Sequence, residues 1–83
     1  MHKRNRHAYR ETMDFTEYRL LLGTHLQGIR KSRGLTQEQV AEHLGMDRVS
    51  VGYIEQGKRT PKLSTLYALS KCYNVGMQDI FNF

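Results

Sequence analysis

Residues 48–56 carry side chains that could read the edges of base pairs. If the segment is helical, with about 100° between successive side chains, one face presents Arg48, Val49, Gly52, Tyr53 and Gln56. An arginine can bind guanine O6 and N7 together, a glutamine can pair with adenine, and a valine can contact the thymine methyl group. Any exposed helix carries assorted polar groups, but a solvated surface gains nothing from a valine or a glycine. The pattern therefore predicts a face that enters the major groove of double-stranded DNA.

The loop after this helix and the opposite face of the helix have different expected roles. Lys58 and Arg59 lie between Gly57 and Pro61, which mark a loop. Two interpretations stay open for these cations, contact with the phosphate backbone or plain solvation. The opposite face is apolar except at its edges and is expected to face the core, with Ser50, Val51, Ile54 and Glu55.

Catalytic and metal-binding patterns are not found. Gly52, Gly57 and Lys58 imitate the start of a phosphate-binding loop, but Arg59 stands where a Ser or Thr would hold magnesium, and no strand precedes it. Cys72 falls in an expected helix and is interpreted as a small core residue rather than a nucleophile. The histidines lack metal-ligand spacing: His2, His7, His25 and His43. We expect no enzyme activity, no metal and no cofactor.

Capping signals predict the helices that position these groups. Asp14 with Glu17, and Thr36 with Gln39, have capping-box spacing, and Asp47 can cap a helix through the amide of Ser50. Helices are therefore expected from about residue 14, from 37 and from 48, with Gly45 in a short turn between the second and third. A fourth follows with an apolar stripe, and residues 77–81 form a last turn: Leu63, Leu66, Leu69 or Ser70, and Tyr73.

The first helix leaves one question open. Leu22, Leu26 and Ile29 recur at helical spacing, but Gly23 and Gly28 each weaken a helix by about 1 kcal/mol relative to Ala. Each glycine marks either a close helix approach or a break, so one long helix and two shorter ones are both compatible with the pattern. No β alternation occurs, and the fold class is all-α, a compact domain of four or five helices.

Composition limits the class of protein. The 83 residues make one small domain, and the single cysteine can form no disulfide within the chain. Neither a membrane span nor a signal peptide is recognisable, which favours the cytoplasm. The net charge of +5 invites a polyanion, and residues 1–15 are expected to be a basic arm or an extra helix before the domain at 16–83. The arm's leading cations are Lys3, Arg4 and Arg6.

The segment LTQEQVAEHLGMDRVSVGYIEQGKRTP, residues 35–61, resembles the helix-turn-helix of the Cro/C1-type, or XRE, family of phage and bacterial repressors. The matches include Gln37, Ala41 at the helix crossing, Gly45 in the turn and the GKR-x-P exit. Further matches extend the resemblance over roughly residues 20–81, at Leu22, Gly23, Leu26, Ile29, Arg30, Val51, Ile54, Glu55, Leu63, Leu66 and Val75. Residues 1–19 fall outside it.

The resemblance implies roles for individual residues. Gln37 would bond a DNA phosphate and brace the base-reading side chains, while Arg30 and Glu55 would form a partly buried ion pair that fixes the helices. Backbone contacts are expected from Thr36, Gln37, Ser50, Lys58 and Arg59. Thr36 has the alternative of being only a cap, and Gln37 that of an exposed helix former. The second helix would lie across the DNA backbone and the third in the major groove.

A homodimer is expected through the C-terminal segment. Its large apolar side chains are too many for a chain end of this size to hide in its own core, and an exposed apolar patch usually marks a partner surface. They are Val75, Met77, Ile80, Phe81 and Phe83. Two domains paired about a two-fold axis would place their third helices about 34 Å apart on a palindromic operator.

The function expected from the sequence is a sequence-specific transcriptional regulator, a repressor that reads a palindromic operator in double-stranded DNA. No small-molecule ligand is expected, since no residues remain for a sensor domain. Two alternatives stay open. One is a restriction-modification controller or antitoxin with the same DNA chemistry, and the other is a protein-interaction module that retains the fold.

Overall fold

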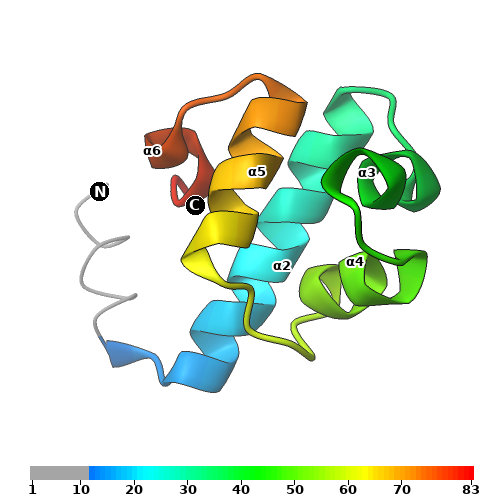
Figure 1. Ribbon diagram of the computed structural model, residues 1–83. Helices are drawn as coiled ribbons and strands as arrows, with labels where there is room; N and C mark the ends of the chain where they lie inside the picture. Colours follow the sequence, from blue (N-terminus) through cyan, green and yellow to red (C-terminus); the bar gives the residue numbers. More distant parts are fainter. Residues whose placement is uncertain (1–11) are drawn as a thin grey trace.

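The computed structural model describes residues 12–83, which form a bundle of short helices around one long helix (Figure 1). In chain order the helices are α2 (Phe15–Ser32), α3 (Gln37–Leu44), α4 (Arg48–Glu55), α5 (Leu63–Tyr73) and α6 (Met77–Ile80). No strand occurs in this part of the chain, which confirms the all-α class. The cations Lys3, Arg4 and Arg6 of the expected basic arm lie outside the described residues.

The long helix α2 crosses the molecule, with α3 and α4 on one side and α5 and α6 on the other (Figure 1). Helix α4 packs against α2 and α3, α5 packs against α3, and α6 contacts both α5 and α2. Because α4 rests on two helices, one of its faces is held against the core and the other stays at the surface.

Helix α2 is continuous and begins with the predicted capping box. Asp14 Oδ1 accepts from the Glu17 amide at 2.9 Å, and the Asp14 amide donates to Glu17 Oε1 at 3.1 Å. Phe15 is therefore the first helical residue, in agreement with the helix expected from about residue 14. The open question between one helix and two is settled in favour of one.

The two glycines of α2 have different surroundings. A Cβ built on Gly23 would lie 2.5 Å from the backbone carbonyl oxygens of both Ile54 and Glu55, whereas one on Gly28 would meet nothing within 4 Å. Gly23 therefore marks the close approach of the C-terminal end of α4 to α2. Gly28 marks neither an approach nor a break.

The turn between α3 and α4 follows the local signals in the sequence. Thr36 Oγ1 accepts from the Gln39 amide at 3.1 Å, and Asp47 Oδ1 accepts from the Ser50 amide at 2.8 Å. Gly45 ends α3 with φ +71°, in the left-handed region where glycine is favoured. The caps and the short turn between α3 and α4 are confirmed.

Helix α5 agrees with the predicted stripe except at its first residue. Leu66, Leu69, Ser70 and Tyr73 are buried, but Leu63 is 70% exposed. Its place on the inner stripe was therefore wrong. The side chains of α5 that face the core are those of Leu66 and Leu69. Leu63 lies four residues before Tyr67, so both side chains are on the outer face of the helix.

The C-terminal segment corrects the expectation of an exposed apolar patch. Ile80 is 0% exposed and belongs to the core, and the other predicted dimer residues are partly buried against that core: Val75, Met77, Phe81 and Phe83. The Phe83 ring lies 5.1 Å from the Tyr18 ring and 5.3 Å from the His25 ring of α2. The chain covers Ile80 fully and the other four in part, because α6 packs on α5 and α2. Counting apolar residues does not reveal this contact between distant segments.

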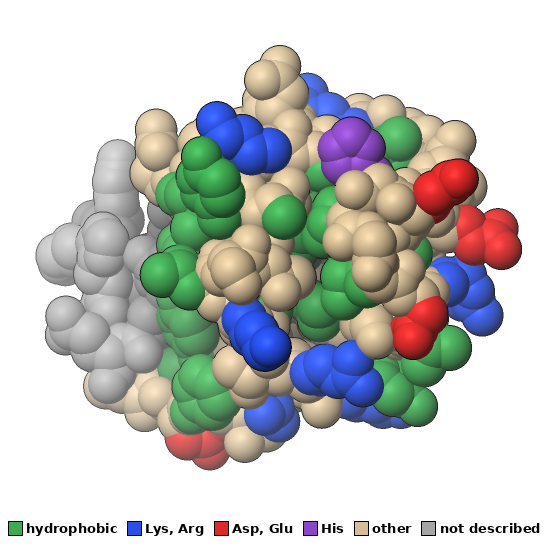
Figure 2. Space-filling model, viewed as in Figure 1, with side chains coloured by type: hydrophobic (Ala, Val, Ile, Leu, Met, Phe, Trp, Pro, Cys, Tyr) green, Lys and Arg blue, Asp and Glu red, His purple; other side chains and the backbone are tan. Residues whose placement is uncertain are grey.

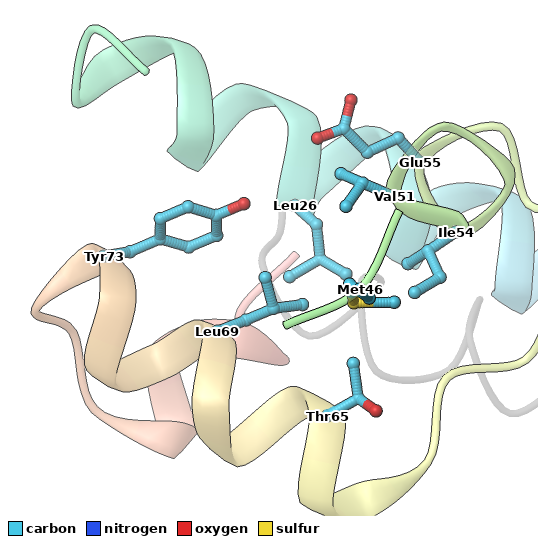
Figure 3. A pocket seen from close by; sticks show the side chains of 8 residues that line it. All are labelled: Leu26, Met46, Val51, Ile54, Glu55, Thr65, Leu69 and Tyr73. Atoms are coloured by element: carbon cyan, nitrogen blue, oxygen red, sulfur yellow. The ribbon is translucent and has the colours of Figure 1, made fainter. Parts of the chain in front are cut away.

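A small cavity lies where α2, α4 and α5 meet (Figure 3). Tyr73 extends its ring from α5 toward Leu26 of α2, and burial raises the pKa of its phenol. The cavity volume is about 10 Å³, which is room for about one water molecule. The site is too small for a metabolite. Its other lining residues are Met46, Val51, Ile54, Glu55, Thr65 and Leu69.

None of the helices in residues 12–83 is both long and apolar enough to cross a membrane.

Candidate nucleic-acid interface

The outer face of α4 has the arrangement that the helical spacing predicts. Arg48, Val49, Tyr53 and Gln56 are exposed, with Val49 at 50% and Tyr53 at 39%, while Val51 and Ile54 on the other side are buried. An exposed valine and tyrosine beside an arginine and a glutamine offer both apolar contacts and hydrogen bonds to base edges.

Gly52 was expected on the face that enters the major groove, but this residue is buried. A Cβ built on Gly52 would lie 3.6 Å from Gln37 Oε1 and 3.8 Å from Gln37 Nε2. The Gln37 amide therefore lies over α4 at Gly52, at a distance that would be ordinary van der Waals contact for a Cβ. Gly52 itself has no side chain with which to contact a base.

A buried ion pair fixes α4 to α2, as the resemblance implied. Arg30 Nε donates to Glu55 Oε2 at 2.7 Å, and Arg30 Nη2 donates to Glu55 Oε1 at 3.1 Å. Arg30 Nη1 also donates to the carbonyl of Leu35 at 2.7 Å. Arg30 is 7% exposed and Glu55 6%. The hydrogen bond to Glu55 raises the pKa of Arg30 against the opposing effect of burial, so the guanidinium stays charged.

Gln37 connects this pair to the surface. Its Nε2 donates to Glu55 Oε1 at 2.9 Å, and its Oε1 accepts from Arg48 Nη1 at 3.4 Å. Both ends of the amide are thus oriented, one by a buried carboxylate and the other by an exposed guanidinium. The arrangement restrains Arg48 on the outer face of α4.

The loop after α4 is tied back to the helix. Arg59 Nη1 donates to Ser50 Oγ at 2.8 Å. The Arg59 guanidinium carbon lies 5.3 Å from the centre of the Tyr53 ring, and Lys58 Nζ lies 6.0 Å from it. Ser50, Lys58 and Arg59, expected at the DNA backbone, therefore lie together beside the outer face of α4. Thr36 is confirmed as a cap, because its hydroxyl oxygen accepts from the Gln39 amide.

Arg19 is a residue that the sequence interpretation missed. Its Nε donates to the carbonyl of Gly57 at 2.8 Å and its Nη1 to Thr60 Oγ1 at 3.4 Å, so α2 holds both ends of the cationic loop. Gly57, with φ +72°, would also place a Cβ 2.7 Å from a Leu20 methyl carbon. Arg19 and Gly57 lie 38 positions apart in the chain, so no local signal predicts this contact, and only the capping glycine was recognisable in the sequence.

Positive charge gathers on the same edge of the molecule. Figure 2 shows Lys and Arg side chains over the loop that follows α4, while acidic side chains lie over α3. The described residues contain no cluster of three or more His, Cys, Asp or Glu side chains that could hold a metal. Burial raises the pKa of the Cys72 thiol, which disfavours the thiolate form needed for nucleophilic chemistry.

Comparisons with known proteins agree with this geometry. A family model described as Helix-turn-helix matches residues 26–80. An uncharacterized HTH-type transcriptional regulator from Archaeoglobus fulgidus is 32% identical over 60 residues, which cover 72% of this chain and 86% of that protein. Control protein C.SmaI from Serratia marcescens is 33% identical over 66 residues, covering 80% of this chain and 79% of that protein.

Solved structures show the same arrangement of helices. The restriction-modification controller protein C.AhdI from Aeromonas hydrophila has a TM-score of 0.79 and 29% identity, and the match covers 83% of this chain and 100% of that chain. The DNA-binding domain of BldD has a TM-score of 0.71 and 33% identity, covering 82% of this chain and 97% of that chain. The family model spans more than half of the 83 residues and includes the turn, the capped helices α3 and α4, and the buried ion pair. The chain therefore belongs to the Cro/C1-type helix-turn-helix family.

Proposed function

We propose that the protein is a sequence-specific regulator of transcription that binds double-stranded DNA through α4. The observation that carries the proposal is the hydrogen-bonded path from the buried Arg30–Glu55 pair through Gln37 to the exposed Arg48. A helix face that only contacts solvent gains nothing from this path of hydrogen bonds. An arginine that reads a base does gain, because restraining its side chain before binding reduces the entropy lost when it contacts a guanine.

The remaining polar groups divide between base edges and phosphates. In the proposed complex Arg48, Val49 and Gln56 face the base pairs in the major groove. The contacts with the sugar-phosphate backbone come from the start of α3 and the loop after α4, through Thr36, Gln37, Ser50, Lys58 and Arg59. The backbone contacts fix orientation and the base contacts select sequence.

We propose a two-fold homodimer on a palindromic operator, with a surface that differs from the C-terminal one. Leu63 and Tyr67 are 70% and 54% exposed and lie four residues apart on one face of α5. Phe15 at the start of α2 is 59% exposed, and Figure 2 shows hydrophobic side chains in a band beside α5 that reaches the start of α2. An exposed apolar band of this kind suits a second copy of the chain.

A specific observation favours one type of regulator. The match to C.AhdI covers all of that chain, and C.SmaI is matched over 79% of its length. We therefore propose control of a restriction-modification operon as the second, narrower function. The wider proposal is a repressor, which acts by occupying an operator that overlaps a promoter.

Selection of bound duplexes from random DNA tests the proposal. The purified protein is expected to enrich a palindrome, and a search of the host genome with that site distinguishes a controller, whose site precedes restriction-modification genes, from a repressor of other genes. Failure to enrich any sequence would favour the remaining alternative, a protein-interaction module that retains the fold.

A further inference from the structure

The Tyr53 ring lies where the outer face of α4 meets the loop that follows it. Although its hydroxyl could contact a base, the contacts recorded for this side chain involve the ring. Arg59 lies 5.3 Å from the ring centre and Lys58 6.0 Å, within the range at which a cation is attracted to an aromatic face. Two cations of the loop therefore lie over the ring.

Arg59 is held from a second direction by the start of α4. Its Nη1 donates to Ser50 Oγ, and the Ser50 amide in turn donates to the Asp47 cap. The nearby Arg59 charge also contributes to lowering the pKa of Asp47, after the larger effect of the hydrogen bonds from Ser50. The guanidinium is thus fixed between an aromatic face and a hydroxyl, while its other N–H groups donate to no atom in the described part of the chain.

We propose that Tyr53 is a positioning residue, whose ring holds Arg59 and Lys58 in place to contact DNA phosphates. The inference rests on the proposed function and assigns Tyr53 to affinity that is independent of sequence. A long cationic side chain loses rotamer freedom when it is fixed on a phosphate. The ring reduces that loss because Arg59 is already restrained in the free protein.

Positioning of the cations depends on the ring of Tyr53, whereas base reading would depend on its hydroxyl. The ring face makes both contacts with the cations, so Tyr53→Phe keeps them and Tyr53→Leu removes them while retaining an apolar side chain of similar reach. A base-reading tyrosine would depend on its hydroxyl, and Tyr53→Phe would then lose discrimination between sequences.

The test measures affinity against salt concentration for a selected duplex and a scrambled one. Each phosphate contact contributes about 0.9 to the slope of log affinity against log salt. For Tyr53→Leu we expect a slope smaller by up to about two units and the same fold-loss on both duplexes. Tyr53→Phe should match the wild type in slope and in affinity. In a Lys58→Ala and Arg59→Ala background, adding Tyr53→Leu should change neither quantity.

The positioning role of Tyr53 and the proposed DNA binding would be refuted by different results. An unchanged slope in Tyr53→Leu, or a loss that persists without the two cations, would refute the positioning role while leaving DNA binding intact. A loss in Tyr53→Phe on the selected duplex alone would assign the hydroxyl to base reading. If the wild type binds neither duplex, the proposed function fails, and the positioning role fails with it. Thermal melting of each variant checks that the fold is retained, as expected for a side chain that is 39% exposed.

Discussion

The side-chain amide of Gln37 donates to the buried carboxylate of Glu55 at 2.9 Å, through an Nε2 that lies over the backbone of Gly52. This contact links the core to the candidate DNA surface, because the same amide accepts from Arg48 through its oxygen. A buried ion pair between α2 and α4 thereby orients an exposed guanidinium. The buried Arg30–Glu55 pair contributes to stability and the exposed Arg48 to recognition, so substitutions at the two ends of this path should have separable effects.

Glu55→Ala should destabilise the fold more than it alters recognition. The substitution leaves Arg30, which is 7% exposed, without its carboxylate, and breaking a buried pair in this way costs about 3–5 kcal/mol. Chemical denaturation measures the free energy of unfolding. The matched control replaces both Arg30 and Glu55 by Met, which removes the unpaired charge and should recover a large part of the loss. A loss below about 1 kcal/mol would mean that the pair behaves as a solvated one.

Substitutions at the two glycines of α2 should have opposite signs. Gly23→Ala places a methyl group 2.5 Å from two carbonyl oxygens of α4, and overpacking of this kind costs about 1–3 kcal/mol. Gly28→Ala meets no atom within 4 Å and should stabilise the helix by about 0.8–1.0 kcal/mol. Thermal melting of the pair provides the comparison. Equal shifts in the same direction would contradict the close approach of α4 to Gly23.

The Asp47 cap should make stability depend on pH at the acidic end. Hydrogen bonds from Ser50 lower the pKa of this carboxyl, so the folded state favours its charged form. The stabilisation is complete above the unfolded pKa of about 3.9, and is lost as pH falls through the lower pKa of the folded state. Asp47→Asn keeps an N-cap acceptor without the charge. The difference in unfolding free energy between wild type and Asp47→Asn should therefore shrink on acidification, and a constant difference would contradict the shift.

Ile80 and Leu63 should respond differently to a polar substitution. Ile80 is 0% exposed, and truncating a buried isoleucine costs about 2–5 kcal/mol, so Ile80→Ser should destabilise the monomer. Leu63 is 70% exposed, and Leu63→Ser should leave the melting of the monomer nearly unchanged while weakening association. Sedimentation over a range of concentrations measures the dimer. An unaltered dimer in both Leu63→Ser and Tyr67→Ser would exclude this face of α5.

Local signals in the sequence predicted the helices well, for a physical reason. Asp14, Thr36 and Asp47 satisfy amides three residues away, and Gly45 adopts a positive φ that its own lack of a side chain allows. These interactions lie within one turn of helix, so the residues that determine them are adjacent in the chain. The outward face of α4 followed from the same periodicity.

The errors arose where the outcome depends on distant segments. Ile80 is buried because α6 packs on α2 and α5, and Gly52 is buried because Gln37 lies over it. Arg19 contacts a carbonyl 38 residues away. The composition of a segment does not specify which helix covers it. Contacts between distant segments can be identified only from the three-dimensional structure.

The most direct test of DNA recognition through α4 compares Arg48→Ala with the wild type on a selected duplex and on a scrambled one. A guanidinium that contacts a guanine contributes about 1–3 kcal/mol to discrimination between bases. We expect Arg48→Ala to lose that amount on the selected duplex and little on the scrambled one. Equal losses on both duplexes, or no loss on either, would contradict the central claim that the outer face of α4 reads sequence.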